Sequence, residues 1–228
     1  MQKQNNPLLE LIFNIIVPSV ILMKFSGPED LGAVNGLILA LAFPLSYGAY
    51  ELAKYKKFNF ISILGFVSVL LTGGIGLLEL DNQWLAIKEA AIPGIIALII
   101  AISGVLGKPL VAKLLVNDTV MKTDVLYQAL KDNGTEDAFK KALVKANYLL
   151  ASTFCFSSVV NYFLAKFIVT SPAGSTEFNE QLGELTLWSY PMIVLPSMIM
   201  MFAVMYFIWK SIKRNTGLNL DQVFNTEG

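Results

Sequence analysis

The chain has 228 residues, of which 55% are hydrophobic and 15% charged, and its 17 basic and 17 acidic side chains cancel to a net charge of zero. Soluble domains carry about 25% charged residues, so this composition, with a mean hydropathy of +0.60, argues against a soluble fold. The apolar runs are continuous and do not alternate in strand-length segments, which disfavours a β-barrel. The sequence therefore predicts an all-α, polytopic integral membrane helical bundle that forms a single domain over residues 1–228.

Six apolar runs approach the length of about 20 residues that a helix needs to cross a bilayer. They lie near residues 8–25, 31–52, 58–78, 90–106, 149–169 and 185–208. The first run also invites interpretation as a cleaved signal peptide. However, Glu10 and Asn14 interrupt its apolar core, and Ser26-Gly27-Pro28-Glu29 is not a small-x-small cleavage site. We therefore expect a retained helix and six transmembrane segments.

Basic residues are sorted to one side of this arrangement, because the connections between runs one and two, three and four, and five and six are acidic and poor in lysine. Positive charge resists translocation across the membrane. The distribution predicts that both termini are cytoplasmic and that the basic face attracts anionic lipid headgroups, at about 1 kcal/mol for each well-placed Lys or Arg. The lipid bilayer is thus the first expected partner. Nothing in the chain resembles a nucleic-acid-reading surface, so no nucleic-acid partner is expected.

One polar stretch, residues 117–145, is long enough to form an amphipathic cytoplasmic connector. Asp118 or Thr119 is placed to cap a first short helix, and Gly134 suits the left-handed position that ends it. Thr135 is placed to cap a second helix that continues into the fifth run. We expect this connector to lie on the inner membrane surface; a partner-binding arm is the alternative.

Catalytic chemistry has few candidate residues, because the chain has no histidine and a single cysteine, Cys155. Serine–histidine and cysteine–histidine nucleophile systems and histidine-containing zinc sites are excluded. Cys155 is expected to be a buried, inert thiol. The glycines of 73–76 do not match a phosphate-binding loop. The prediction is a non-enzymatic protein with no catalytic residues, no metal site and no cofactor.

Small and polar residues recur at helical spacing inside the runs, where they would let helices approach closely. The expected packing positions are Gly65, Thr72, Gly73, Gly74 and Gly76 in the third run and Asn147, Ser158 and Asn161 in the fifth. The alternative is a lined pathway or pocket, because ionisable residues in membrane segments commonly mark functional sites. The candidate polar site comprises Glu79, Asp81, Lys88 and Glu89, with Glu10 and Asn14 of the first run.

The stretch between the third and fourth runs contains most of these candidates. Asp81-Asn82-Gln83 is predicted to form an outward-facing turn, and Trp84 an anchor at the membrane interface. Lys88 and Glu89 are expected to begin the next run. The acids therefore favour a short hairpin on the outer side of the membrane over a buried catalytic cluster.

The order and spacing of residues in this stretch resemble the intracellular septation protein A family of bacterial inner-membrane proteins. The resemblance rests on Gly73-Gly74, Asp81-Asn82, Trp84, Ile87-Lys88 and Lys108-Pro109-Leu110. It covers Ile61–Leu115, with a weaker likeness over Lys145–Phe167. The chain departs from the family pattern after Lys88, where Glu89-Ala90-Ala91 stands in place of a short polar pair.

The resemblance implies a multi-pass protein of the bacterial inner membrane with a role in cell-envelope maintenance or septation. The implied partners are membrane proteins of envelope synthesis or division, and no reaction is implied. Two hypotheses follow for the chain: a non-enzymatic membrane scaffold, or a small transporter or lipid-handling protein with a polar site near the outer ends of the third and fourth helices.

Overall fold

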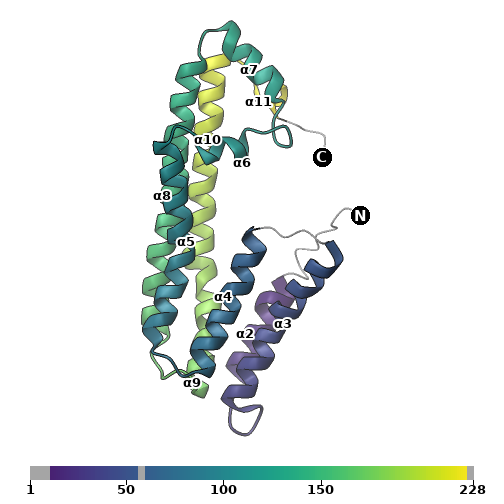
Figure 1. The fold of residues 1–228 in the computed structure, drawn as a ribbon, viewed down its shortest axis with the longest axis vertical. Helices are drawn as coiled ribbons and strands as arrows, with labels where there is room; N and C mark the ends of the chain where they lie inside the picture. Colours follow the sequence, from purple (N-terminus) through teal and green to yellow (C-terminus); the bar gives the residue numbers. More distant parts are fainter. Residues whose placement is uncertain (1–10, 56–59, 225–228) are drawn as a thin grey trace. The chain divides into compact units, whose positions relative to one another are not determined.

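The computed structural model describes residues 11–55 and 60–224, which form helices and turns with one isolated antiparallel bridge between Met121 and Phe224. The chain divides into two compact units (Figure 1). Unit 1 comprises Met1–Ile92 and Val159–Val194, and unit 2 comprises Pro93–Ser158 and Leu195–Gly228. Two of the three boundaries fall within long helices, so α5 and α8 contribute residues to both units, and the third separates η2 from α10.

Unit 1 contains mainly apolar helices. They are η1 (Ile12–Ile16), α2 (Val17–Lys24), α3 (Gly32–Tyr55), α4 (Phe60–Leu77), the first half of α5 (Asn82–Val105), the last part of α8 (Glu136–Ile168), α9 (Thr176–Ser189) and η2 (Tyr190–Val194). Helix α2 packs on α3 and α9, and α3 packs on α4. The core side chains include Leu37, Leu85 and Phe178, each at most 1% exposed.

Unit 2 is built around a second apolar core, with Leu126, Leu130 and Ile212 among its most buried members. Its further elements are α6 (Leu110–Leu115), α7 (Thr123–Asp132), α10 (Leu195–Thr216) and α11 (Leu220–Val223). In Figure 1, α7 and α11 lie beside the C-terminal end of α10, which is coloured yellow. A backbone hydrogen bond from Lys122 N to Val223 O, at 2.7 Å, joins the start of α7 to the end of α11.

The connector differs from the expectation in two ways. Its first helix begins at Thr123, so the proposed caps Asp118 and Thr119 lie outside it, although Gly134 does end it with φ +63°. Its apolar face is covered by protein, because Leu126 and Leu130 are fully buried in the core of unit 2. The connector is therefore a docked part of the fold in its first half and the beginning of α8 in its second.

Among the described residues, four helices are long and apolar enough to cross a membrane: Gly32–Tyr50, Asn82–Val105, Glu136–Ile168 and Thr176–Thr216. The last includes the π-helical turn η2, which contains Pro191. A π turn leaves one backbone carbonyl without its usual partner, which accommodates a residue that has no N–H. In the other two predicted spans, the described residues form shorter apolar helices, Ile12–Lys24 and Leu64–Leu77. The structure thus supports a helical protein with four segments of membrane-spanning length.

Several helices extend beyond their apolar runs. Helix α5 begins at Asn82 and not near residue 90, so Lys88 and Glu89 lie inside it and do not begin it. Helix α8 begins at Glu136, directly after the predicted cap Thr135, and continues through the fifth apolar run, as expected. Hydrophobicity marks the part of a helix that lipid or protein covers, whereas a helix continues wherever its backbone hydrogen bonds do.

Candidate functional site

Three connections predicted to share one side of the membrane meet at one end of unit 1. Asn82 Nδ2 donates to Ser171 O at 2.6 Å and to Val169 O at 3.3 Å, which ties the start of α5 to the segment after α8. Thr176 Oγ1 donates to Ser26 O at 3.0 Å, which ties that segment to the α2–α3 connection. We refer to this region, residues 25–31, 78–82 and 169–176, as the three-connection end.

A buried asparagine holds the same end from within. Asn179 is fully buried, and its Nδ2 donates to Ala33 O at 2.7 Å and to Ser26 Oγ at 3.1 Å. Gly36 makes room for this contact, because a Cβ there would lie 2.5 Å from Ser26 Oγ. The amide replaces hydrogen bonds that water would otherwise supply to Ala33 O and Ser26. Asn179 therefore fastens α9 to the start of α3.

The two acids of the α4–α5 turn, Glu79 and Asp81, take part in ending α4 and beginning α5. Asp81 Oδ1 accepts a hydrogen bond from Gln83 N at 2.7 Å, as an N-terminal helix cap does. Glu79 has φ +51°, and the bonds Leu80 N to Ile75 O and Glu79 N to Gly76 O close α4 in the way that a left-handed terminal residue does. Neither acid pairs with Lys88, whose partners are Glu89, Ser68 and Thr72, so the structure does not assemble the four candidate residues into one site.

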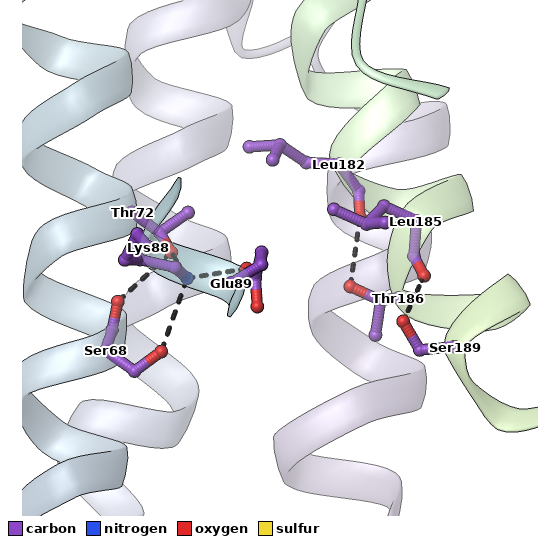
Figure 2. A network of polar contacts seen from close by, with 8 residues as sticks. All are labelled: Ser68, Thr72, Lys88, Glu89, Leu182, Leu185, Thr186 and Ser189. Carbon is purple, nitrogen blue, oxygen red and sulfur yellow. Dashed lines mark hydrogen bonds and ion pairs between the residues drawn. The ribbon is translucent and has the colours of Figure 1, made fainter. Parts of the chain in front are cut away.

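Lys88 and Glu89 do come together, with two hydroxyls of α4. Lys88 Nζ donates to Thr72 Oγ1 at 2.8 Å and to Ser68 Oγ at 3.3 Å, and it lies 2.6 Å from Glu89 Oε1 (Figure 2). Ser68 and Thr72 are four residues apart and share one face of α4, where Thr72 Oγ1 also donates to Ser68 O at 3.1 Å. We call these four residues the Lys88 cluster.

The Lys88 cluster is closed around its ammonium group. An ammonium has three N–H donors, and the three oxygens within 3.3 Å provide one acceptor for each. The side chain of Lys88 is only 7% exposed, whereas that of Glu89 is 28% exposed. A buried charge is tolerated only when it is paired and hydrogen-bonded. The geometry can therefore hold α5 against α4.

Two further hydroxyls lie on α9 in the view of Figure 2, which shows Thr186 and Ser189 across from Glu89. Each donates back to its own helix, Thr186 Oγ1 to Leu182 O at 2.9 Å and Ser189 Oγ to Leu185 O at 2.7 Å. Such bonds satisfy a hydroxyl in an apolar setting. They add polar groups to this part of unit 1 without joining the Lys88 cluster.

Unit 2 also contains a buried asparagine that joins several segments by hydrogen bonds, Asn147 of α8. Asn147 is fully buried; its Nδ2 donates to Ile100 O at 2.6 Å and to Ser103 Oγ at 3.2 Å, and its Oδ1 accepts from Val111 N at 3.1 Å. A Cβ on Gly104 would lie 3.0 Å from Asn147 Nδ2. One amide thus satisfies backbone groups at the end of α5 and the start of α6.

The other predicted packing positions divide into two groups. A Cβ on Gly76 would lie 2.5 Å from Leu37 Cδ2, and one on Gly73 would lie 2.9 Å from Leu41 Cδ1, so both glycines sit at close helix contacts. Among the described residues, nothing lies within 4 Å of a Cβ on Gly65 or Gly74. The described residues therefore make no close helix contact at these two positions.

The remaining candidates have varied surroundings. Ser158 packs against Gly94, where an added Cβ would lie 3.0 Å from its Oγ. Asn161 and Asn14 are half-buried on α8 and η1, and Glu10 lies outside the described residues. Cys155 is exposed, which corrects the expectation of a buried thiol. In the part of the chain that the structure describes, no group of three Asp, Glu or Cys side chains is placed to hold a metal ion.

Sequence reasoning missed Asn179 and Ser26. Asn179 stands among acidic residues that indicated a loop, and Ser26 stands in a Ser-Gly-Pro turn. Only their burial and mutual contact reveal their role. Trp84 lies at the start of α5 with 58% of its surface exposed, as an interfacial side chain would.

Comparison with known proteins gives no counterpart for these arrangements. No family model, no curated protein and no solved structure matches this chain.

Proposed function

We propose that the chain is a non-enzymatic membrane scaffold of the bacterial inner membrane. In this proposal six helical segments lie in the membrane, both termini are cytoplasmic, and contacts with other membrane proteins serve envelope maintenance or septation. The observation that carries the proposal is the closure of the Lys88 cluster. The ammonium group of Lys88, which lies inside a candidate span, has all three of its N–H donors bonded within the chain, as expected of a contact that holds two helices together.

The arrangement of the connections supports the proposed topology. The hydrogen bonds of the three-connection end join the α2–α3, α4–α5 and α8–α9 connections. Connections that bond to one another lie on the same side of a membrane. They hold no lysine or arginine between residues 25–31, 78–82 and 169–176. The positive-inside rule then assigns this end to the outside and the lysine-rich opposite ends to the cytoplasm.

The resemblance to the septation protein A family supplies the proposed process. Three of the residues that carry the resemblance lie where helices are joined. Asn82 donates a hydrogen bond to the α8–α9 connection, Lys88 of α5 donates one to Thr72 of α4, and Pro109 precedes α6. Markers of this kind favour a shared fold, because each determines how helices are joined. The role in envelope maintenance or septation is carried by the resemblance alone.

Crosslinking in native membranes tests the scaffold proposal. The tagged protein, expressed at its natural level in its own host, is crosslinked in cells, purified and analysed by mass spectrometry. A tagged, unrelated multi-pass protein expressed at the same level is the control. We expect at least one envelope-synthesis or division protein to be recovered repeatedly with this chain and not with the control. Recovery of the chain without any such partner would contradict the proposal.

A small transporter is the second candidate, favoured by the position of an ion pair inside a candidate span. Lys88 lies six residues after the start of α5, or about 9 Å along the helix at 1.5 Å per residue. Ionisable groups at such depth commonly serve transport. Reconstituted protein should then show solute or lipid flux that Lys88→Gln abolishes and Glu79→Gln preserves, since Glu79 is exposed and outside the cluster. An absence of flux in the parent protein rules this candidate out.

A further inference from the structure

A groove in unit 2 lies outside the Lys88 cluster and the three-connection end. It has a volume of about 560 Å³ and is formed where α5 ends and α6 begins. Its apolar wall includes Ile99, Ile102 and Leu106 of α5, which are 45%, 49% and 69% exposed. The other wall is formed by residues 108–110, 112 and 113, which include two lysines.

The polar character of the groove is concentrated in these two lysines. Lys108 and Lys113 are exposed, and among the described residues neither has an ion-pair partner. The lining contains no acidic residue. Ser103, the other polar residue of the lining, donates to Ile100 O at 2.6 Å and accepts from Leu110 N at 3.2 Å, so its hydroxyl is already bonded. The groove thus combines an apolar wall with a double positive charge.

The backbone that bears Lys108 is fixed by its neighbours. Gly107 has φ +67°, and the bonds Gly107 N to Gly104 O and Lys108 N to Ser103 O close the end of α5. Pro109 then restricts the chain before α6, and Asn147 Oδ1 binds Val111 N. A site held in this way needs little ordering when a ligand enters it, which favours binding.

The groove lies at the end of a candidate membrane span, Asn82–Val105, and Ile99 and Ile102 of its apolar wall belong to the last turns of that span. In a membrane, the end of such a span meets the headgroup region, and the preceding turns meet the acyl chains. We propose that the groove binds an anionic phospholipid. Lys108 and Lys113 pair with its phosphodiester headgroup, and one acyl chain lies along Ile99, Ile102 and Leu106. Charge complementarity selects this occupant, because basic pockets at the ends of membrane helices suit anionic headgroups.

Native mass spectrometry of the full-length protein in detergent tests this proposal. The probes are phosphatidylglycerol and phosphatidylcholine with the same acyl chains. We expect the parent to bind one phosphatidylglycerol more tightly than phosphatidylcholine. The double variant Lys108→Gln/Lys113→Gln should bind phosphatidylglycerol roughly thirty-fold more weakly, which corresponds to two headgroup contacts of ordinary strength. Its preference over phosphatidylcholine should disappear.

Two matched variants control for charge and for folding. Lys140→Gln/Lys141→Gln removes the same charge from exposed positions of α8 and should leave the lipid affinity within about two-fold of the parent, because screening limits charges outside the groove. Ile102→Trp keeps both lysines but fills the apolar wall, and it should weaken both lipids. If Lys140→Gln/Lys141→Gln weakened phosphatidylglycerol binding as much as Lys108→Gln/Lys113→Gln does, the proposal would be overturned. Unchanged lipid binding by Ile102→Trp would overturn it as well.

A final arm separates a lipid site from a general anion site. Inorganic phosphate in large excess should not displace phosphatidylglycerol, because it has no acyl chain to occupy the wall formed by α5. Displacement by phosphate would overturn the lipid assignment. Lys108→Arg/Lys113→Arg, which retains both charges, should bind phosphatidylglycerol within about three-fold of the parent, since each Arg also pairs with phosphate. Loss of lipid binding by this variant would also contradict the proposal.

Discussion

Lys88 of α5 donates to Thr72 of α4 at 2.8 Å while it pairs with its own chain neighbour Glu89 at 2.6 Å. A charge and its counter-charge are thus adjacent in sequence, and the hydroxyl comes from another helix. This arrangement makes a lock that can be tested by removing one charge or both.

Lys88→Met should lower the free energy of unfolding by about 2–3 kcal/mol, because it leaves Glu89 without its cation and two hydroxyls without their donor. The cost is below the 3–5 kcal/mol of a fully buried pair because Glu89 is 28% exposed. Lys88→Met/Glu89→Leu should recover most of the loss, since it removes both charges. Thermal unfolding in detergent measures both changes. If the double variant were no more stable than Lys88→Met, the unpaired charge of Glu89 would not be the main cause of the destabilisation.

Gly76 and Gly74 provide a matched pair on one helix. Gly76→Ala should destabilise the protein by about 1–3 kcal/mol, because the new Cβ would lie 2.5 Å from Leu37 Cδ2 and 3.2 Å from Phe178 Cε1. Gly74→Ala meets nothing within 4 Å among the described residues and should be neutral or stabilising by up to about 1 kcal/mol. Unfolding temperatures of the two variants, measured side by side, check the order. If the two substitutions changed the unfolding temperature equally, Gly76 would not lie at a close contact between α3 and α4.

Asn147→Ala should cost about 2–4 kcal/mol, since it leaves the buried Val111 N and Ile100 O without their side-chain partner. Asn147→Asp should be at least as damaging, because an oxygen would replace the amide nitrogen that lies 2.6 Å from Ile100 O. Gln128→Ala, at an exposed position of α7, is the control and should change stability by less than about 0.5 kcal/mol. Thermal unfolding in detergent compares the three. An Asn147→Ala variant as stable as the control would exclude the proposed lock.

Single cysteines test the topology in intact cells. Because Cys155 is exposed, the parent for these variants is Cys155→Ser. Glu29→Cys and Glu177→Cys, at exposed positions of the three-connection end and the start of α9, should react with a membrane-impermeant maleimide added outside. Lys131→Cys, near the end of α7, should react only after the cells are permeabilised. The reverse pattern would invert the proposed orientation.

The sequence by itself determined the helical class, the positions of the apolar segments and the break at Gly134. Each of these follows from local chemistry: the length of an apolar run, the lack of charge within it, and the freedom of glycine to adopt φ +63°. It also identified Asn147, Gly73 and Gly76 as positions to examine, because small and amide side chains stand out in an apolar helix. The same rule selected Gly65 and Gly74, which face open space.

Only the tertiary structure decided which of these residues meet. Asn82 bonds to a carbonyl 89 residues away, and Asn179 bonds to a serine 153 residues away. It also separated Lys88 and Glu89 from the acids of the turn, and covered the apolar face of α7 with protein. Hydropathy and helical periodicity describe one helix at a time. The partner of a buried polar group depends on how several helices pack, because the group must find its hydrogen bonds on whichever neighbour the packing supplies.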